Sequence, residues 1–208
     1  MTRNGWYRCF GKRVLDVVGA GLAIALLLPV VVVVAMFVRV LLGSPVLFRQ
    51  RRPGLHGAPF VLVKFRSMTD RLDGAGRRLP DAERLTRAGR FLRAFSLDEI
   101  PQLLNVMCGD MSLVGPRPLL FEYLERYTPW QARRHDVRPG ITGLAQVGGR
   151  NALSWEQKFE LDVEYVERCS PALDVKILGL TVRQVLARHG ISQPGHATAT
   201  QFGGTLDS

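Results

Sequence analysis

Residues 17–38 read VVGAGLAIALLLPVVVVVAMFV, a run of about 22 residues without a charged side chain. As a helix rising 1.5 Å per residue, this run is long enough to cross a hydrocarbon core about 30 Å thick. A buried core helix is the alternative, but a run this long and apolar on every face is unusual in a small soluble domain. The run therefore predicts a membrane segment. No signal-peptide cleavage pattern follows Arg39, so we expect the segment to be retained.

Basic residues flank the run on both sides, and Pro29 lies near its middle. Positive residues favour the cytoplasmic side of a membrane, and a simple crossing cannot place both flanks there. A proline inside a helix removes one hydrogen bond and favours a kink. We therefore expect a re-entrant membrane helix broken at Pro29, with a Pro-kinked spanning helix as the alternative. The flanking cations are Lys12, Arg13, Arg39, Arg49, Arg51 and Arg52.

The rest of the pattern predicts an α+β fold that is mainly helical. Apolar runs at 46–50 and 60–65 around a turn rich in Pro and Gly indicate a short antiparallel β-hairpin. Residues 70–90 lack periodicity and predict a mobile loop leading into a helix at 90–95. Apolar, aromatic and basic residues alternate over 119–135. This pattern favours a pair of interfacial amphipathic helices near the functional site, with core packing as the alternative.

Three parts of the chain follow from these elements. We expect residues 1–42 to form the membrane helix with its basic flanks, and residues 43–190 to form a domain on the cytosolic face that would carry any catalytic site, including a helix at 155–166. Residues 191–208 are polar and Gly-rich, and they predict a loose C-terminal extension.

Composition restricts the possible chemistry. The 28 Lys and Arg residues against 18 Asp and Glu give a net charge of +10, which attracts polyanions such as nucleic acid, anionic lipid or phosphate-rich small molecules. The three cysteines are far apart, and the four histidines show no metal-ligand spacing, so neither a zinc site nor a disulfide framework is expected. Neither a P-loop nor a Rossmann glycine motif is present.

Two adjacent carboxylates, Asp98 and Glu99, lie just before Pro101 and the apolar run that follows it. Because proline is tolerated only in a first helical turn, we expect a helix to start there, with both carboxylates at its N-terminus. That position favours ionised carboxylates and attracts phosphate. Such a site suits an attacking Asp beside a metal-binding Glu, whereas helix capping by Ser96 and Asp98 is the structural alternative.

Basic side chains with rigid neighbours recur along the chain, as in Pro116-Arg117-Pro118 and Gly149-Arg150. An arginine held in this way can bind phosphate oxygens through two hydrogen bonds. Several of them beside a carboxylate pair indicate a diphosphate pocket, where Mg²⁺ would be held by carboxylate and substrate oxygens. The residues alone thus predict a membrane-embedded phosphoryl-transfer enzyme.

Four motifs resemble those of the bacterial sugar transferases called monotopic phosphoglycosyl transferases. They are KFRSM at 64–68, SLDEIPQL at 96–103, GDMSLVGPRP at 109–118 and RPGITG at 138–143, and the resemblance extends over about residues 10–195. The small size of the chain is similar to the single-domain class of that family.

The resemblance implies transfer of a sugar phosphate from a UDP-sugar to undecaprenyl phosphate, with release of UMP, at the cytoplasmic face of the bacterial inner membrane. It implies that Asp98 attacks the β-phosphorus to form a covalent intermediate and that Glu99, beside Asp98, binds Mg²⁺. It further assigns phosphate or nucleotide contacts to basic residues and an orienting role to two acids. These residues are Lys64, Arg93, Arg117, Arg150, Asp162 and Asp174.

This sequence departs from the family pattern at three places: Leu28 precedes Pro29, Leu144 follows Thr-Gly, and Gly148-Gly149 follows Gln-Val. Two other functions fit the charge, namely a membrane-tethered nucleic-acid-binding module and a Mg²⁺-dependent membrane phosphohydrolase. No nucleic-acid partner is expected, because no recognition helix or aromatic RNA-binding motif is evident. The motifs leave the sugar, the glycan pathway and the oligomeric state open.

Overall fold

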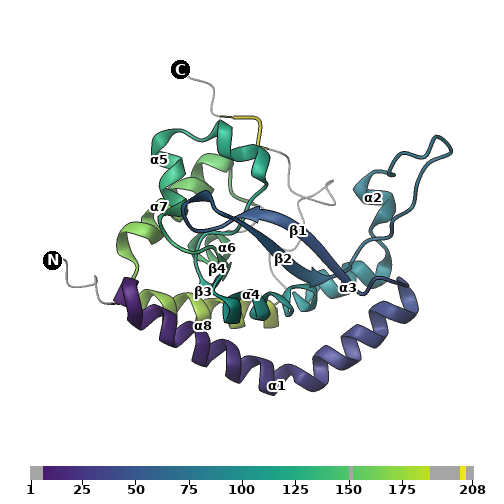
Figure 1. The fold of residues 1–208 in the computed structure, drawn as a ribbon, viewed down its shortest axis with the longest axis horizontal. Coiled ribbons are helices and arrows are strands. Elements are labelled where there is room, and N and C mark those ends of the chain that lie inside the picture. The colour runs from purple at the N-terminus through teal and green to yellow at the C-terminus, as the bar shows by residue number, and fades with distance from the viewer. Residues whose placement is uncertain (1–6, 150–151, 188–201, 205–208) are drawn as a thin grey trace.

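A computed structural model describes residues 7–149, 152–187 and 202–204, and these are mostly helical with two small sheets. A π-helical turn at Tyr7–Gly11 leads into the longest helix (Figure 1). The elements are α1 (Lys12–Leu41), β1 (Leu47–Pro53), β2 (Pro59–Phe65), α2 (Asp81–Arg84), α3 (Arg87–Ala94), α4 (Gln102–Cys108), β3 (Ser112–Val114), α5 (Pro129–Ala132), β4 (Gly140–Thr142), α6 (Leu144–Gly148), α7 (Trp155–Arg168) and α8 (Pro171–Ala187).

Helix α1 is 30 residues long and continues through Pro29, so the structure does not break it there. It is bowed beneath the rest of the molecule (Figure 1). Both halves pack on the same domain: Ala20 is buried against α4, and Val38 is buried in a cluster with Phe65 and Leu92. A proline forfeits only one hydrogen bond, and a helix supported on both sides of it can bend without ending.

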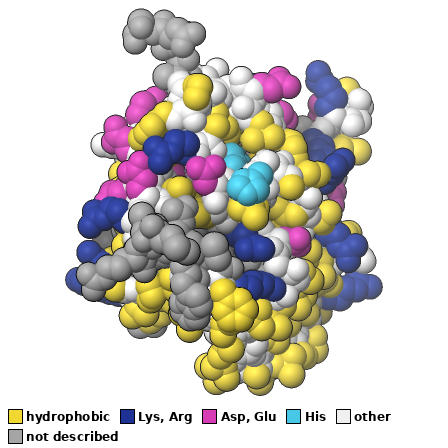
Figure 2. Space-filling model, turned by 60° about the vertical axis from the view of Figure 1, so that its left-hand side comes forward, with side chains coloured by type: hydrophobic (Ala, Val, Ile, Leu, Met, Phe, Trp, Pro, Cys, Tyr) yellow, Lys and Arg dark blue, Asp and Glu magenta, His cyan; other side chains and the backbone are white. Residues whose placement is uncertain are grey.

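Most of α1 faces away from the domain. Only 11% of its most apolar window is buried, and Leu26 is 79% exposed. Among the described residues, α1 is the one helix long and apolar enough to cross a membrane. Hydrophobic side chains gather at the lower end of the molecule in Figure 2, and Lys and Arg side chains border them. An apolar surface of this size marks a membrane-associated protein.

Exposed apolar side chains also occur on α3, α4 and α8, which lie just above α1 in Figure 1. They include Phe91, Leu104, Met107, Val175 and Val182. Apolar exposure is thus found on these helices as well as on α1.

The expectation of a helix pair at 119–135 was wrong. The segment folds as short turns, with 3-10 turns at Phe121–Arg126 and Arg133–Asp136 on either side of α5. Two of its aromatic residues serve core packing: Tyr123 and Tyr127 pack against Phe159 of α7 and against Phe202, whereas Trp130 is exposed. Burial of the rings, rather than helical periodicity, accounts for their spacing.

Phe202 lies in the expected loose C-terminal extension, yet it packs on the domain. Its side chain is buried in the aromatic cluster, its backbone N–H donates to the Tyr123 hydroxyl, and its carbonyl accepts from Arg126. Residues 191–201 and 205–208 of the predicted extension lie outside the described residues.

Strands β1 and β2 form an antiparallel pair in which Leu47 faces Phe65 and Pro53 faces Pro59. The pair extends to Pro53, beyond the expected end at residue 50. On the free edge of β2, the Asn105 side chain of α4 donates to the Val61 carbonyl and accepts from the Val63 N–H, as a neighbouring strand would. These two bonds hold the hairpin on α4.

A second, parallel pair joins β3 to β4 through a close backbone approach. Gly115 N–H donates to the Thr142 carbonyl, and a Cβ on Gly140 would lie 2.0 Å from the Gly115 nitrogen. Only glycine permits this crossing, and it sets the direction of the Pro116-Arg117 segment that follows.

The segment predicted as a loop contains the short helix α2, and the helix expected at 90–95 begins earlier, at Arg87. Thr86 caps that helix by accepting from the Gly89 N–H. The helix expected at 155–166 is confirmed as α7, which a Ser154–Gln157 capping box starts.

Candidate active site

Asp98 lies on a 3-10 turn, Leu97–Glu99, between α3 and α4. The carboxylates are therefore not in the first turn of α4, which begins at Gln102 after Pro101. Ser96, before the turn, has a left-handed backbone with φ of 53° and makes no side-chain capping bond. The capping alternative is thus not observed for Ser96. Instead, the left-handed backbone of Ser96, which L-residues seldom adopt, sets the direction of the turn that carries Asp98.

The structure brings three predicted cations to the Asp98–Glu99 pair. Lys64 comes from the end of β2, Arg93 from the last turn of α3, and Arg117 from the segment after β3. Arg93 Nε donates to Ser67 Oγ at 3.0 Å, and Arg117 Nη2 donates to Glu99 Oε1 at 2.6 Å. All three interact electrostatically with Asp98. Elements far apart in the sequence thus converge on one carboxylate.

Asp98 is only 5% exposed, and this burial dominates its electrostatics. Burial raises the pKa of the Asp98 carboxyl, the adjacent Glu99 charge raises it further, and Lys64, Arg93 and Arg117 oppose the rise. Burial likewise lowers the pKa of Lys64. A carboxylate stripped of water and held beside cations suits nucleophilic attack on a phosphorus whose oxygens those cations can neutralise.

Glu99 is the better placed of the two acids to share a metal with a substrate, because its side chain is partly exposed while Asp98 is buried. Among the described residues, no group of three or more His, Cys, Asp or Glu side chains could hold a metal ion. The carboxylates available at this site are those of Asp98 and Glu99, and Mg²⁺ commonly binds through one or two carboxylates together with substrate phosphates.

Asp162 does not reach the carboxylate pair directly. It is buried and accepts from Arg134 Nε and Nη2 at 3.0 and 2.7 Å, and Arg134 Nη2 also donates to the Arg117 carbonyl at 2.7 Å. Asp162 therefore orients Arg134, which holds the backbone of Arg117. The sequence analysis missed Arg134, since Arg133-Arg134-His135 resembles an exposed basic run and only the buried partner marks it as structural.

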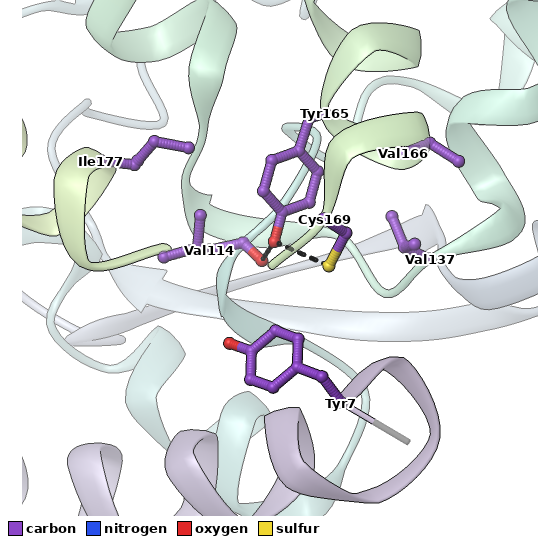
Figure 3. Close-up of a cluster of buried hydrophobic side chains, with 7 residues drawn as sticks. All are labelled: Tyr7, Val114, Val137, Tyr165, Val166, Cys169 and Ile177. Carbon is purple, nitrogen blue, oxygen red and sulfur yellow. Dashed lines mark hydrogen bonds between the residues drawn. The ribbon is translucent and has the colours of Figure 1, made fainter. Parts of the chain in front are cut away.

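Asp174 anchors the N-terminal part of the chain through a buried set of hydrogen bonds. Its carboxylate accepts from Lys12 Nζ and the Tyr7 hydroxyl, each at 2.6 Å, and from the Tyr165 hydroxyl at 2.7 Å. Figure 3 shows Tyr7 and Tyr165 in the buried cluster around Val114, whose carbonyl oxygen lies 3.0 Å from the Tyr165 hydroxyl and shares its hydrogen with Asp174. Asp174 thus ties the start of α1 to α8. Arg150, the remaining predicted residue, lies outside the described residues.

A buried carboxylate ringed by cations, above an exposed apolar helix, defines a membrane-associated enzyme that acts on phosphorylated substrates. The chain belongs to the bacterial sugar transferase family, whose model matches residues 7–188.

Several bacterial proteins are similar in sequence to this chain. The chain is 57% identical over 196 residues to an uncharacterized sugar transferase, EpsL, of Bacillus subtilis, covering 94% of this chain and 97% of that protein. It is 45% identical over 190 residues to a UDP-glucose:undecaprenyl-phosphate glucose-1-phosphate transferase of Caulobacter vibrioides, covering 84% and 69%. A protein of the same description from Escherichia coli is 40% identical over 183 residues, covering 82% of this chain and 39% of the relative.

Proposed function

We propose that this protein transfers a sugar phosphate from a UDP-sugar to undecaprenyl phosphate, releases UMP, and so starts the assembly of a polysaccharide or glycoprotein glycan. The observation that carries the proposal is the buried Asp98 carboxylate among Lys64, Arg93 and Arg117. The named activities of the relatives from Caulobacter vibrioides and Escherichia coli support the same reaction.

The reaction proceeds in two displacements. An Asp98 oxygen attacks the β-phosphorus of the UDP-sugar, the bond from that phosphorus to the bridging oxygen breaks, and UMP leaves with the bonding electrons. The sugar phosphate is then attached to Asp98 as an acyl phosphate. A phosphate oxygen of the lipid attacks the same phosphorus, and Asp98 departs as a carboxylate.

The cations act on the charge that moves in these steps. Lys64, Arg93 and Arg117 neutralise the diphosphate oxygens, and the buried setting strengthens that effect. Arg117 also holds Glu99 in place. Glu99, beside Asp98, would hold Mg²⁺ together with the substrate oxygens. When bound, Mg²⁺ supplies charge neutralisation to the leaving UMP.

The membrane arrangement belongs to the same proposal. A straight spanning helix would carry one of its ends to the far side of the bilayer, yet both halves of α1 pack on one domain. We therefore assign α1 as a re-entrant helix, bent near Pro29, with the active site on the cytoplasmic face of the bacterial inner membrane. Basic residues on both flanks agree with this assignment.

The test is UMP release from a panel of UDP-sugars with Mg²⁺, with and without undecaprenyl phosphate, for the native protein, Asp98→Asn and Glu99→Gln. We expect lipid-dependent turnover that Asp98→Asn abolishes and Glu99→Gln strongly reduces. Release of free sugar phosphate without the lipid would favour the phosphohydrolase alternative. Full activity of Asp98→Asn would contradict the assigned nucleophile. Binding of DNA, indifferent to Asp98, would support the nucleic-acid alternative, which the family does not favour.

A further inference from the structure

A groove of about 550 Å³ lies between the start of β1 and the segment after β2. Its apolar wall consists of Pro45, Leu47 and the Phe48 ring. The volume falls within the usual range for small-molecule sites. Neither the family description nor the reaction proposed above assigns a ligand to this groove.

The charged lining of the groove carries three arginines, Arg49, Arg66 and Arg78, against one acid, Asp70. Arg66 is already engaged: it donates to the Leu42 and Ser44 carbonyls at the end of α1 and forms an ion pair with Asp70. Arg78 is also paired with Leu72 in an antiparallel β-bridge.

Arg49 and Arg78 are both exposed, and neither forms an ion pair with any acid in the part of the chain that the structure describes. Because Asp70 is shared by Arg66 and Arg84, the groove keeps an excess of positive charge. Two guanidinium groups beside an apolar wall suit an anionic group attached to an apolar chain.

The position of the groove connects the lipid surface with the active site. Its wall begins at Pro45, four residues after α1 ends at Leu41, and the last turn of α1 exposes the apolar Val40. At the other end, the Phe48 ring that lines the groove also lies 5.3 Å from Lys64 Nζ. Lys64 in turn interacts with Asp98.

We propose that this groove binds the acceptor lipid, with Arg49 and Arg78 holding the phosphate monoester and the wall of Pro45, Leu47 and Phe48 contacting the first part of the isoprenoid chain. The proposal rests on the transferase function proposed above. A nucleotide-sugar donor is the poorer match, because it carries no long apolar chain that could contact the wall of Pro45, Leu47 and Phe48. The groove offers the amphipathic lining that the lipid requires.

The test separates the two displacements in the full-length protein. The double variant Arg49→Gln/Arg78→Gln is compared with Arg51→Gln/Arg77→Gln, in which Arg51 lies on the same strand outside the groove and Arg77 is paired with Asp73. The first measurement is the UMP released per enzyme without lipid. The second is the KM for undecaprenyl phosphate in micelles of a neutral detergent.

We expect the groove variant to release UMP in the first displacement like the native protein but to show a KM for undecaprenyl phosphate raised roughly tenfold or more. The control variant should match the native protein in both measurements. An unchanged KM for the lipid would overturn the proposal, as would an equal loss of UMP release without lipid, which would make the groove a donor site.

Two further outcomes are distinguishable. If the defect occurs only in vesicles containing phosphatidylglycerol, and as weaker vesicle binding, the groove binds bulk anionic phospholipid and the proposal is wrong. If the native protein itself shows no lipid-dependent UMP release, the proposed function fails, whatever the variants do.

Discussion

At the scale of single residues, Asp98 must be charged to attack, yet its burial favours the protonated form. Burial raises the pKa of Asp98, so the acid limb of the pH profile of kcat/KM should lie above the ordinary range of an aspartate. Removing the Lys64 charge removes one of the groups that lower this pKa. Lys64→Gln should therefore shift the acid limb to higher pH, besides slowing the reaction.

The measurement is the midpoint of the acid limb of UMP release, and the control is Lys158→Gln. Lys158 lies over the Trp155 ring, and of the acidic groups it interacts with Asp162 rather than Asp98. If the midpoint of the acid limb is unchanged in Lys64→Gln, or moves to lower pH, the assignment of this limb to Asp98 is contradicted.

Ser96 gives a second prediction at this scale. A β-branched side chain is strained at φ of 53°, so Ser96→Val should lower the free energy of unfolding by about 1–2 kcal/mol and reduce kcat by displacing the Asp98 turn. Ser96→Gly, which fits the same backbone, should keep the stability near that of the native protein. Denaturant unfolding and UMP release measure both; equal stability of the two variants would refute the strain.

At the scale of elements, the close packing of α3 on Ser67 requires a glycine at position 89. A Cβ there would lie 1.8 Å from the Ser67 carbonyl oxygen, and Ser67 also receives the bond from Arg93. Gly89→Ala should therefore destabilise the fold by about 1–3 kcal/mol and, by moving α3, weaken the hold of Arg93 on the site. The UMP released in the first displacement should fall accordingly.

The matched control is Gly179→Ala in α8, where a Cβ meets nothing within 4 Å. That change should be neutral or stabilising by about 0.5–1 kcal/mol, since alanine favours a helix. Thermal unfolding compares the two variants. A native-like melting temperature for Gly89→Ala would show that α3 does not pack as closely on Ser67 as described.

At the scale of the whole molecule, Asp174 joins the start of α1 to α8 through Lys12 and Tyr7. Asp174→Asn leaves Lys12 buried without its charge partner, so the free energy of unfolding should fall by about 3–5 kcal/mol. Folded molecules of the variant should keep the KM for the UDP-sugar. A raised KM with unchanged stability would instead support the substrate role that the sequence had indicated.

Glu167→Gln provides the comparison, because Glu167 forms an ion pair with Arg133 in which both side chains are largely exposed. Solvent screens such a pair, and its loss should cost about 0–1 kcal/mol. Unfolding by denaturant ranks the two variants, and an equal loss in both would show that the Lys12–Asp174 pair is not buried as the structure has it.

The sequence by itself determined the long apolar helix, the strands around the Pro- and Gly-rich turn, and the adjacent carboxylates Asp98 and Glu99, and its motifs pointed to Lys64, Arg93 and Arg117 as candidate cations. These features are local. An uncharged run, a two-residue period or a motif can be recognised from neighbouring residues alone, whatever the tertiary contacts.

Only the tertiary structure decided which charges meet. In the structure, α1 continues through Pro29, and residues 119–135 fold as short turns. Asp174 pairs with Lys12, and Arg134 donates a hydrogen bond to the Arg117 carbonyl. These outcomes depend on burial and on contacts between residues distant in sequence. A buried charge must be paired inside the fold, and the linear pattern does not state which partner the fold will bring to it.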